Sequence, residues 1–283
     1  MIIIFLSTLT LIFFLIIFFN IRYKELRWNW SEIDINKISF PKSFIWGTAT
    51  ASHQVEGNCE NNWSEFEKGF KTDGNPNIKD NQISGLTCDH WNRYKEDIKL
   101  IKKLGVKHYR FSVEWSKIEP EMGEYNKEAL EHYSNLIDDL LKNNIKPVIT
   151  LHHFSHPIWF DKIGAFEKKE NISYLVSFSK RVFDEYSDRV KCWCTINEPG
   201  VVAVQGYFTG MFPPGVQNGP KTAHVFKNLL ESHVQIYHAL KSHINGSKVK
   251  IGIVKNINQF DPWRRYHLFD WLFTIALNHI FNW

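Results

Sequence analysis

The residue best placed for chemistry is Glu198, which closes an apolar segment that reads VKCWCTINEP over residues 190–199. Pro199 has no N–H to donate and therefore ends a strand's hydrogen-bond ladder. A carboxyl group at the end of a buried strand is suited to general acid–base catalysis, in which a positioned side chain gives a proton to a leaving group. A surface glutamate in a loop is the alternative interpretation.

Polar side chains occur at corresponding points of three other segments. Gln54 follows FIWGTATASH, Arg110 lies within VKHYRFSV, and His153 ends VITLHH. An amide offers both a donor and an acceptor, which suits a pair of neighbouring hydroxyl groups. The alternatives are a turn-capping role for Gln54, a structural ion pair for Arg110 and a core position for His153.

Short apolar runs alternate with segments of helical periodicity along most of the chain. The predicted strands are 44–52, 106–113, 148–154, 190–196 and 248–254, and the predicted helices are centred on 91–101, 130–140, 175–186 and 229–244. Such alternation is typical of a parallel sheet, and doubly wound sheets and (β/α)8 barrels both fit it. A dinucleotide-binding sheet would carry GxGxxG after a strand, and this sequence has none. Polar groups at the carboxyl ends of four strands favour the barrel, because barrel enzymes build their sites there.

Several motifs in this region resemble those of glycoside hydrolase family 1, the β-glucosidase family. In family order they are FIWGTATASHQVEG (44–57), RYKEDIKLIKKLGVKHYRFSVEWSKIEP (93–120), TLHHFSHPIWF (150–160), GAF (164–166), TINEP (195–199) and GMFPPG (210–215). The resemblance implies an α/β fold of the (β/α)8 TIM-barrel type. It also implies a retaining β-glycosidase that hydrolyses the O-glycosidic bonds of β-glucosides with no cofactor and no metal.

The resemblance implies a role for each polar residue as well. Glu198 matches the acid/base, and Asn197 matches the residue that donates a hydrogen bond to the sugar 2-hydroxyl. Gln54 and His153 match residues that bind the non-reducing sugar. Arg110 matches the residue that positions and ionises the nucleophile.

The chain departs from the family pattern in two ways. Phe154 stands where many members have Trp, and Ser155–His156 stand where Asp–Leu is common, which bears on substrate preference. The family nucleophile lies in a TENG-like motif of the seventh strand, and no such motif occurs here. We therefore expect a barrel truncated after about five strands, with the nucleophile absent from this chain or supplied by a separate carboxyl-terminal half. The alternative function is a non-catalytic sugar- or partner-binding remnant of the same fold.

The amino terminus is strongly apolar. Of residues 2–19, fifteen are Ile, Leu or Phe and none is charged. As a helix this run spans about 27 Å, close to the roughly 30 Å of a bilayer core. It has no basic segment before it and no small-residue cleavage site after it, which favours an uncleaved single-pass anchor over the signal peptide of a secreted protein.

Basic residues follow the apolar run, so the positive-inside rule favours a cytoplasmic location for the rest of the chain. The predicted organisation is a membrane segment at 1–20, a linker at 21–38 and a partial barrel at 39–283.

The net charge is +4, with basic residues interspersed among acidic ones, which argues against a nucleic-acid partner. No Cys/His cluster has zinc spacing. The expected partners are a small β-glycoside and a lipid bilayer.

Overall fold

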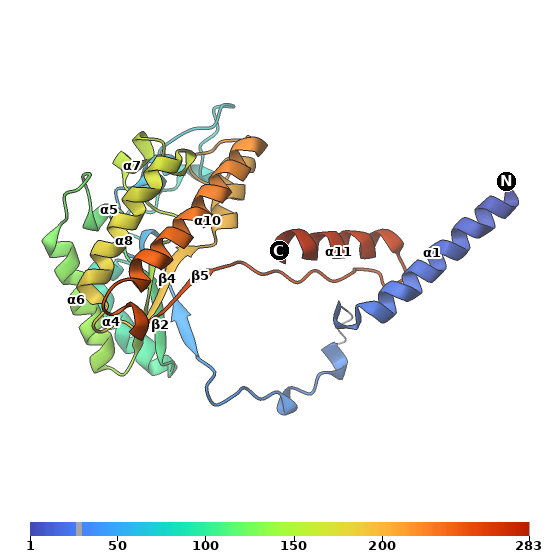
Figure 1. Cartoon of the computed structure of the whole chain (residues 1–283), viewed down its shortest axis with the longest axis horizontal. Coiled ribbons are helices and arrows are strands. Elements are labelled where there is room, and N and C mark those ends of the chain that lie inside the picture. Colours follow the sequence, from blue (N-terminus) through green and yellow to red (C-terminus); the bar gives the residue numbers. More distant parts are fainter. Residues whose placement is uncertain (27–29, 283) are drawn as a thin grey trace. The chain divides into compact units, whose positions relative to one another are not determined.

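The computed structural model describes residues 1–26 and 30–282 and divides into two compact units (Figure 1). The larger unit is Ile45–Lys255, and the smaller one combines Met1–Phe44 with Asn256–Trp283. Residues 27–29, within the predicted linker, lie outside the described residues. The carboxyl-terminal segment from residue 256, which the sequence assigned to the barrel, makes its contacts within the smaller unit.

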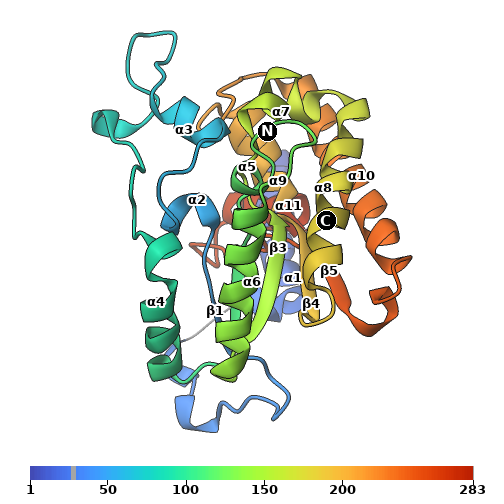
Figure 2. The same ribbon diagram turned by 90° about the vertical axis from the view of Figure 1, so that its left-hand side faces the viewer.

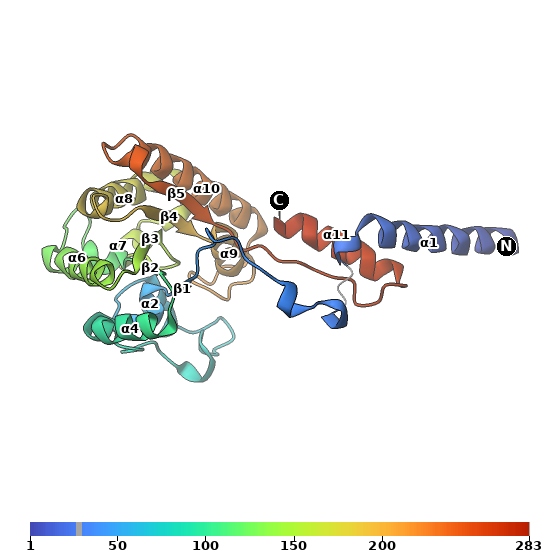
Figure 3. The ribbon, with the colours of Figure 1, turned by 90° about the horizontal axis from the view of Figure 1, so that it is seen from below.

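The larger unit is built on a five-stranded sheet. Its strands are β1 (Gly47–Ala49), β2 (His108–Ser112), β3 (Lys146–His152), β4 (Cys192–Asn197) and β5 (Lys250–Val254). They lie side by side in chain order, and every neighbouring pair is parallel (Figures 2 and 3). The predicted parallel sheet is confirmed.

The first strand is shorter than predicted. Only Gly47–Ala49 pairs with β2, and the chain then enters the one-turn helix α2 (Ser52–Val55). The change has a local cause, because the backbone N–H of Ser52 donates to Ser112 Oγ at 2.7 Å instead of to strand backbone. Gln54 therefore lies in a helix just beyond the strand.

A helix connects each pair of successive strands. These helices are α4 (His90–Leu104), α6 (Lys127–Lys142), α8 (Ile172–Tyr186) and α10 (Gly219–Lys241), and they lie along the outer side of the arc of strands (Figure 3). Shorter helices lie in the connections, namely α3 (Asn62–Glu67), α5 (Trp115–Ile118), α7 (Ile158–Lys162) and α9 (Pro199–Ala203). Asn126 caps α6 by accepting from two backbone N–H groups, and Gly105 ends α4 in the left-handed region that favours glycine.

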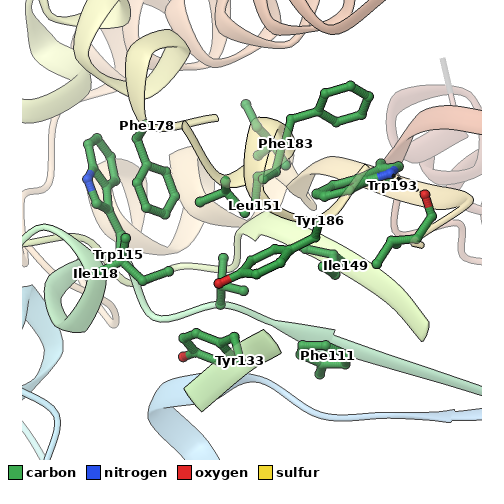
Figure 4. Close-up of a cluster of buried hydrophobic side chains, with 14 of the residues drawn as sticks. Phe111, Trp115, Ile118, Tyr133, Ile149, Leu151, Phe178, Phe183, Tyr186 and Trp193 are labelled. Carbon is green, nitrogen blue, oxygen red and sulfur yellow. Dashed lines mark hydrogen bonds between the residues drawn. The ribbon is translucent and has the colours of Figure 1, made fainter. Parts of the chain in front are cut away.

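Aromatic side chains fill the space between the sheet and the helices (Figure 4). The ring of Trp115 stacks on Phe178 of α8 at a centroid distance of 4.9 Å, and Trp193 of β4 lies 4.8 Å from Phe183. All four are at most 2% exposed. Removing each such side chain from water contributes about 2–3 kcal/mol. This core holds α8 against β3 and β4, the strands that carry His153 and Glu198 at their ends.

The smaller unit contains two apolar helices, α1 (Ile2–Arg22) and α11 (Leu268–Asn282). Phe19 stacks on Trp271 at 6.1 Å, and Asn20 Nδ2 donates to the carbonyl oxygen of Arg265 at 2.9 Å. By length and composition, Ile3–Arg22 is able to cross a membrane, and an amino-terminal signal sequence would meet the same criteria.

Candidate active site

Glu198 lies directly after β4, at the amino-terminal cap of α9. Its backbone φ is +46°, in the left-handed region that few residues other than glycine adopt. The backbone N–H of Glu198 donates to the carbonyl oxygen of Val254 in β5 at 2.8 Å, which fixes the turn. Residues with a strained backbone of this kind cluster at functional sites. The side chain of Glu198 is half-buried.

Asn197 and Arg110 are in direct contact. Arg110 projects from β2, its guanidinium donates to Asn197 Oδ1, and its Nε donates to Thr150 Oγ1 of β3 at 2.9 Å. Asn197 is only 3% exposed. One cation thereby joins β2, β3 and β4 and holds the residue next to Glu198 in place.

His153 is the first residue after β3 and lies within the electrostatic reach of Arg110. Burial, together with the positive charge of Arg110, lowers the pKa of His153 to about 4. The imidazole is therefore neutral at pH 7, with one N–H donor and one acceptor. Such a ring is able to hydrogen-bond a hydroxyl group in either sense.

Gln54 is exposed and lies in α2, beyond the end of β1. Because the strands are parallel and adjacent, the segments that carry Gln54, Arg110, His153 and Glu198 all leave the sheet at its carboxyl edge. A hydrogen bond joins Arg110 to Asn197, and the segment that carries Gln54 is tied to the segment after β3 through buried polar residues.

Those buried residues include a carboxylate that the sequence analysis did not single out. Glu114 follows β2, is fully buried, and accepts hydrogen bonds from Ser52 of α2 and Ser155 of the segment after β3. Its local signal was weak, since one acidic residue in the run RFSVEWS looks like many surface residues. Ser52 and Ser155 are separated from it by tens of residues in the chain, which no local pattern reveals.

Aromatic side chains gather at the same edge of the sheet. Trp63 of α3 packs edge-on against Phe212 with centroids 4.8 Å apart, and Phe154 lies 5.7 Å from Phe212. Phe154, the departure noted in the sequence, has a φ of +72°. Flat apolar side chains here are able to contact the rings or the attached groups of a sugar ligand.

In the described part of the chain, no group of three His, Cys, Asp or Glu side chains comes together. The side chains described above supply carboxyl, amide, imidazole and guanidinium groups. Proton transfer by Glu198 beside hydrogen-bonding groups for hydroxyls is the combination that these residues offer.

The sequence profile described as Glycosyl hydrolase family 1 matches residues 36–268. The 1,4-beta-D-glucan glucohydrolase of Thermotoga neapolitana is 37% identical over 225 residues, which are 79% of this chain and 52% of that protein. The cytosolic beta-glucosidase of Homo sapiens is 36% identical over 72% of this chain and 45% of its own length.

Solved structures give the same result for the fold. Beta-glucosidase from Thermotoga maritima in complex with noeuromycin superposes with a TM-score of 0.77 at 36% identity, over 86% of this chain and 54% of that one. The chain thus spans about half the length of the relatives that it matches, and its five strands form the corresponding part of their (β/α)8 barrel. The match of the profile to most of this chain shows that it belongs to glycosyl hydrolase family 1.

Proposed function

We propose that the protein serves as a retaining β-glycosidase that hydrolyses β-glucosides or related small glycosides. The observation that carries the proposal is the contact between Arg110 and Asn197, which holds the residue before Glu198 in place at the carboxyl edge of the sheet, with the neutral His153 within the electrostatic reach of Arg110. The relatives named as a glucan glucohydrolase and a β-glucosidase support the substrate class.

In the proposed mechanism Glu198 is the acid/base. Its proton passes to the glycosidic oxygen as the bond to the anomeric carbon breaks and a second carboxylate bonds to that carbon. The Glu198 carboxylate then takes a proton from water, which attacks the same carbon and releases the second carboxylate. Asn197 donates to the sugar 2-hydroxyl, and Gln54 and His153 bind hydroxyl groups of the same sugar. Arg110 keeps the second carboxylate ionised.

The second carboxylate has to lie about 5–5.5 Å from the first. We expect it in a part of the barrel that residues 1–283 do not contain. The chain by itself should therefore hydrolyse aryl β-glucosides no faster than background.

We further propose that α1 anchors the protein in a membrane with the barrel on the cytoplasmic side.

Leaving groups of different acidity test the assignment of Glu198. In this chain joined to the carboxyl-terminal half of a close relative, Glu198→Gln should lower turnover of an aryl glucoside with a poor leaving group by about 10²- to 10⁴-fold. Turnover of the dinitrophenyl glucoside should fall far less, because that group departs unprotonated. Glu60→Gln, at an exposed position, is the control and should leave both rates unchanged.

Three results would contradict the proposal. An equal loss on both substrates would show that Glu198 is not the acid. Rapid hydrolysis by the unjoined chain would show that a carboxylate within residues 1–283 supplies the nucleophile. Sugar binding without hydrolysis in the joined protein would favour the non-catalytic remnant.

A further inference from the structure

Glu114 is a carboxylate with no exposed surface and four neutral hydrogen-bond donors. Its Oε2 accepts from Ser52 Oγ at 2.7 Å and from Ser155 Oγ at 2.9 Å. Its Oε1 accepts from Ser116 Oγ at 2.9 Å and from Asn61 Nδ2 at 3.1 Å. Burying a charge is costly unless enough partners converge on it, and here all the lone-pair directions of the carboxylate are occupied.

Two of these donors come from the segments that carry the candidate sugar-binding residues. Ser52 opens α2 two positions before Gln54, and Ser155 stands two positions after His153. Glu114 follows β2, which lies between β1 and β3 in the sheet. The carboxylate therefore bridges the two segments across the strand that separates them.

A third donor extends the bridge to the residue before Gln54. Asn61 Nδ2 also lies 3.2 Å from His53 Nδ1, and His53 Nε2 lies 2.9 Å from Glu67 Oε1. Because Asn61 Nδ2 is a donor, His53 Nδ1 accepts and Nε2 carries the proton that is donated to Glu67. Both ring nitrogens of His53 are thus engaged, and α2 is held from two sides.

We propose that Glu114 is a positioning residue, which does not touch the sugar but sets the placement of Gln54 relative to His153. The inference rests on the proposed function, in which those two residues bind hydroxyl groups of one sugar. A carboxylate is required, because an amide presents an NH2 group in place of one acceptor. Asn61 Nδ2 or a serine hydroxyl then loses its acceptor, and the two segments are no longer tied at the same spacing.

Selectivity between sugars tests this role without requiring turnover. The full chain in detergent is titrated by calorimetry with a glucose-configured and a galactose-configured iminosugar, which differ in the orientation of one hydroxyl group. We expect the parent chain to discriminate between them and Glu114→Gln to reduce the ratio of the two dissociation constants about tenfold, or 1.4 kcal/mol. A purely structural role would lower the amount of folded protein and leave the ratio unchanged.

Glu119→Gln is the matched control. Glu119 is also a buried glutamate, 4% exposed, but its partners are Trp115 Nε1 at 2.7 Å and the backbone N–H of Gly123 at 2.9 Å, in α5 and the loop after it. Its substitution should leave the ratio as in the parent. If Glu114→Gln does not fold, Ser155→Ala removes one donor only and should reduce the ratio in the same direction.

The outcomes separate this inference from the function on which it rests. An unchanged ratio in a folded Glu114 or Ser155 variant overturns the inference. If the parent chain binds neither iminosugar, residues 1–283 do not hold the sugar by themselves, the proposed function is decided by the test on the joined protein, and hydrogen–deuterium exchange decides on the positioning. Faster exchange of residues 50–56 and 152–157 in Glu114→Gln, but not in Glu119→Gln, supports it, and equal exchange in the two variants overturns it.

Discussion

The carboxyl group of Glu56 is 3% exposed and lies between two partners of different kind. Tyr133 donates its hydroxyl to Oε1 at 2.7 Å, and Lys117 Nζ lies 3.5 Å from Oε2. Burial raises the pKa of Glu56 from 4.5 to about 7, against the opposing influence of Lys117. The folded protein therefore binds this proton more tightly than the unfolded chain does, so this group favours folding most at low pH.

The contribution of Glu56 to stability should consequently fall as pH rises from about 4.5 to 7. Glu56→Gln removes the titration, so between pH 5 and 8 the variant should lose about 2 kcal/mol less of its free energy of unfolding than the parent loses. Urea unfolding of the full chain in detergent at both pH values measures the difference. Glu60→Gln, exposed on the same segment, is the control. Parallel pH profiles for parent and Glu56→Gln would contradict the role given to this proton.

The sequence was informative about residues whose chemistry is visible locally. Asn197 and Glu198 stand out because polar groups end an apolar run, and the structure places Arg110 against Asn197. The burial of Glu56 and Glu114 could not be found in the same way. Their burial depends on partners from other elements, such as Tyr133 of α6 and Ser155 after β3. The periodicity of the sequence does not predict such contacts.

Among the elements, strands β2 to β5 begin and end within two residues of their predicted bounds. The side chains of β2 and β4 are buried on one face and at least half-buried on the other. The start of α10 was missed, at Gly219 rather than at residue 229, since its first turns are exposed and lack apolar spacing. Asn218 starts this helix by accepting from the backbone N–H of Lys221, a signal that the prediction did not use.

Gly206 allows two neighbouring elements to approach closely. It lies in the π-helical turn Val204–Phe208, and a Cβ there would come within 2.7 Å of the carbonyl oxygen of Pro213. Gly206→Ala should therefore lower the free energy of unfolding by about 1–3 kcal/mol. Gly219→Ala is the matched control, because a Cβ at that position meets nothing within 4 Å. Equal urea midpoints for the two variants would show that this contact is not tight in solution.

For the whole molecule, the character of α1 decides how the protein is held in the cell. If α1 is an anchor, the full chain should stay with membranes during carbonate extraction. Arginine at positions 9 and 13 (Leu9→Arg with Phe13→Arg) should release it, since each charge at the centre of a span costs about 2.5–3.5 kcal/mol. Ile4→Leu is the control and should have no effect. A soluble protein whose first residue lies near positions 20–30 would instead establish a cleaved signal peptide.

The order of the strands bears on how the protein is made. Because β1 to β5 are spatial neighbours in the order in which they are synthesised, each strand can add to an edge that already exists as it emerges from the ribosome. The Glu114 carboxylate belongs to the second strand segment to emerge, yet one of its donors, Ser155, emerges only after the third. A nascent chain that ends before Ser155 lacks one donor to Glu114, so we expect this network to tie the segments after the first three strands together only once residue 155 has emerged.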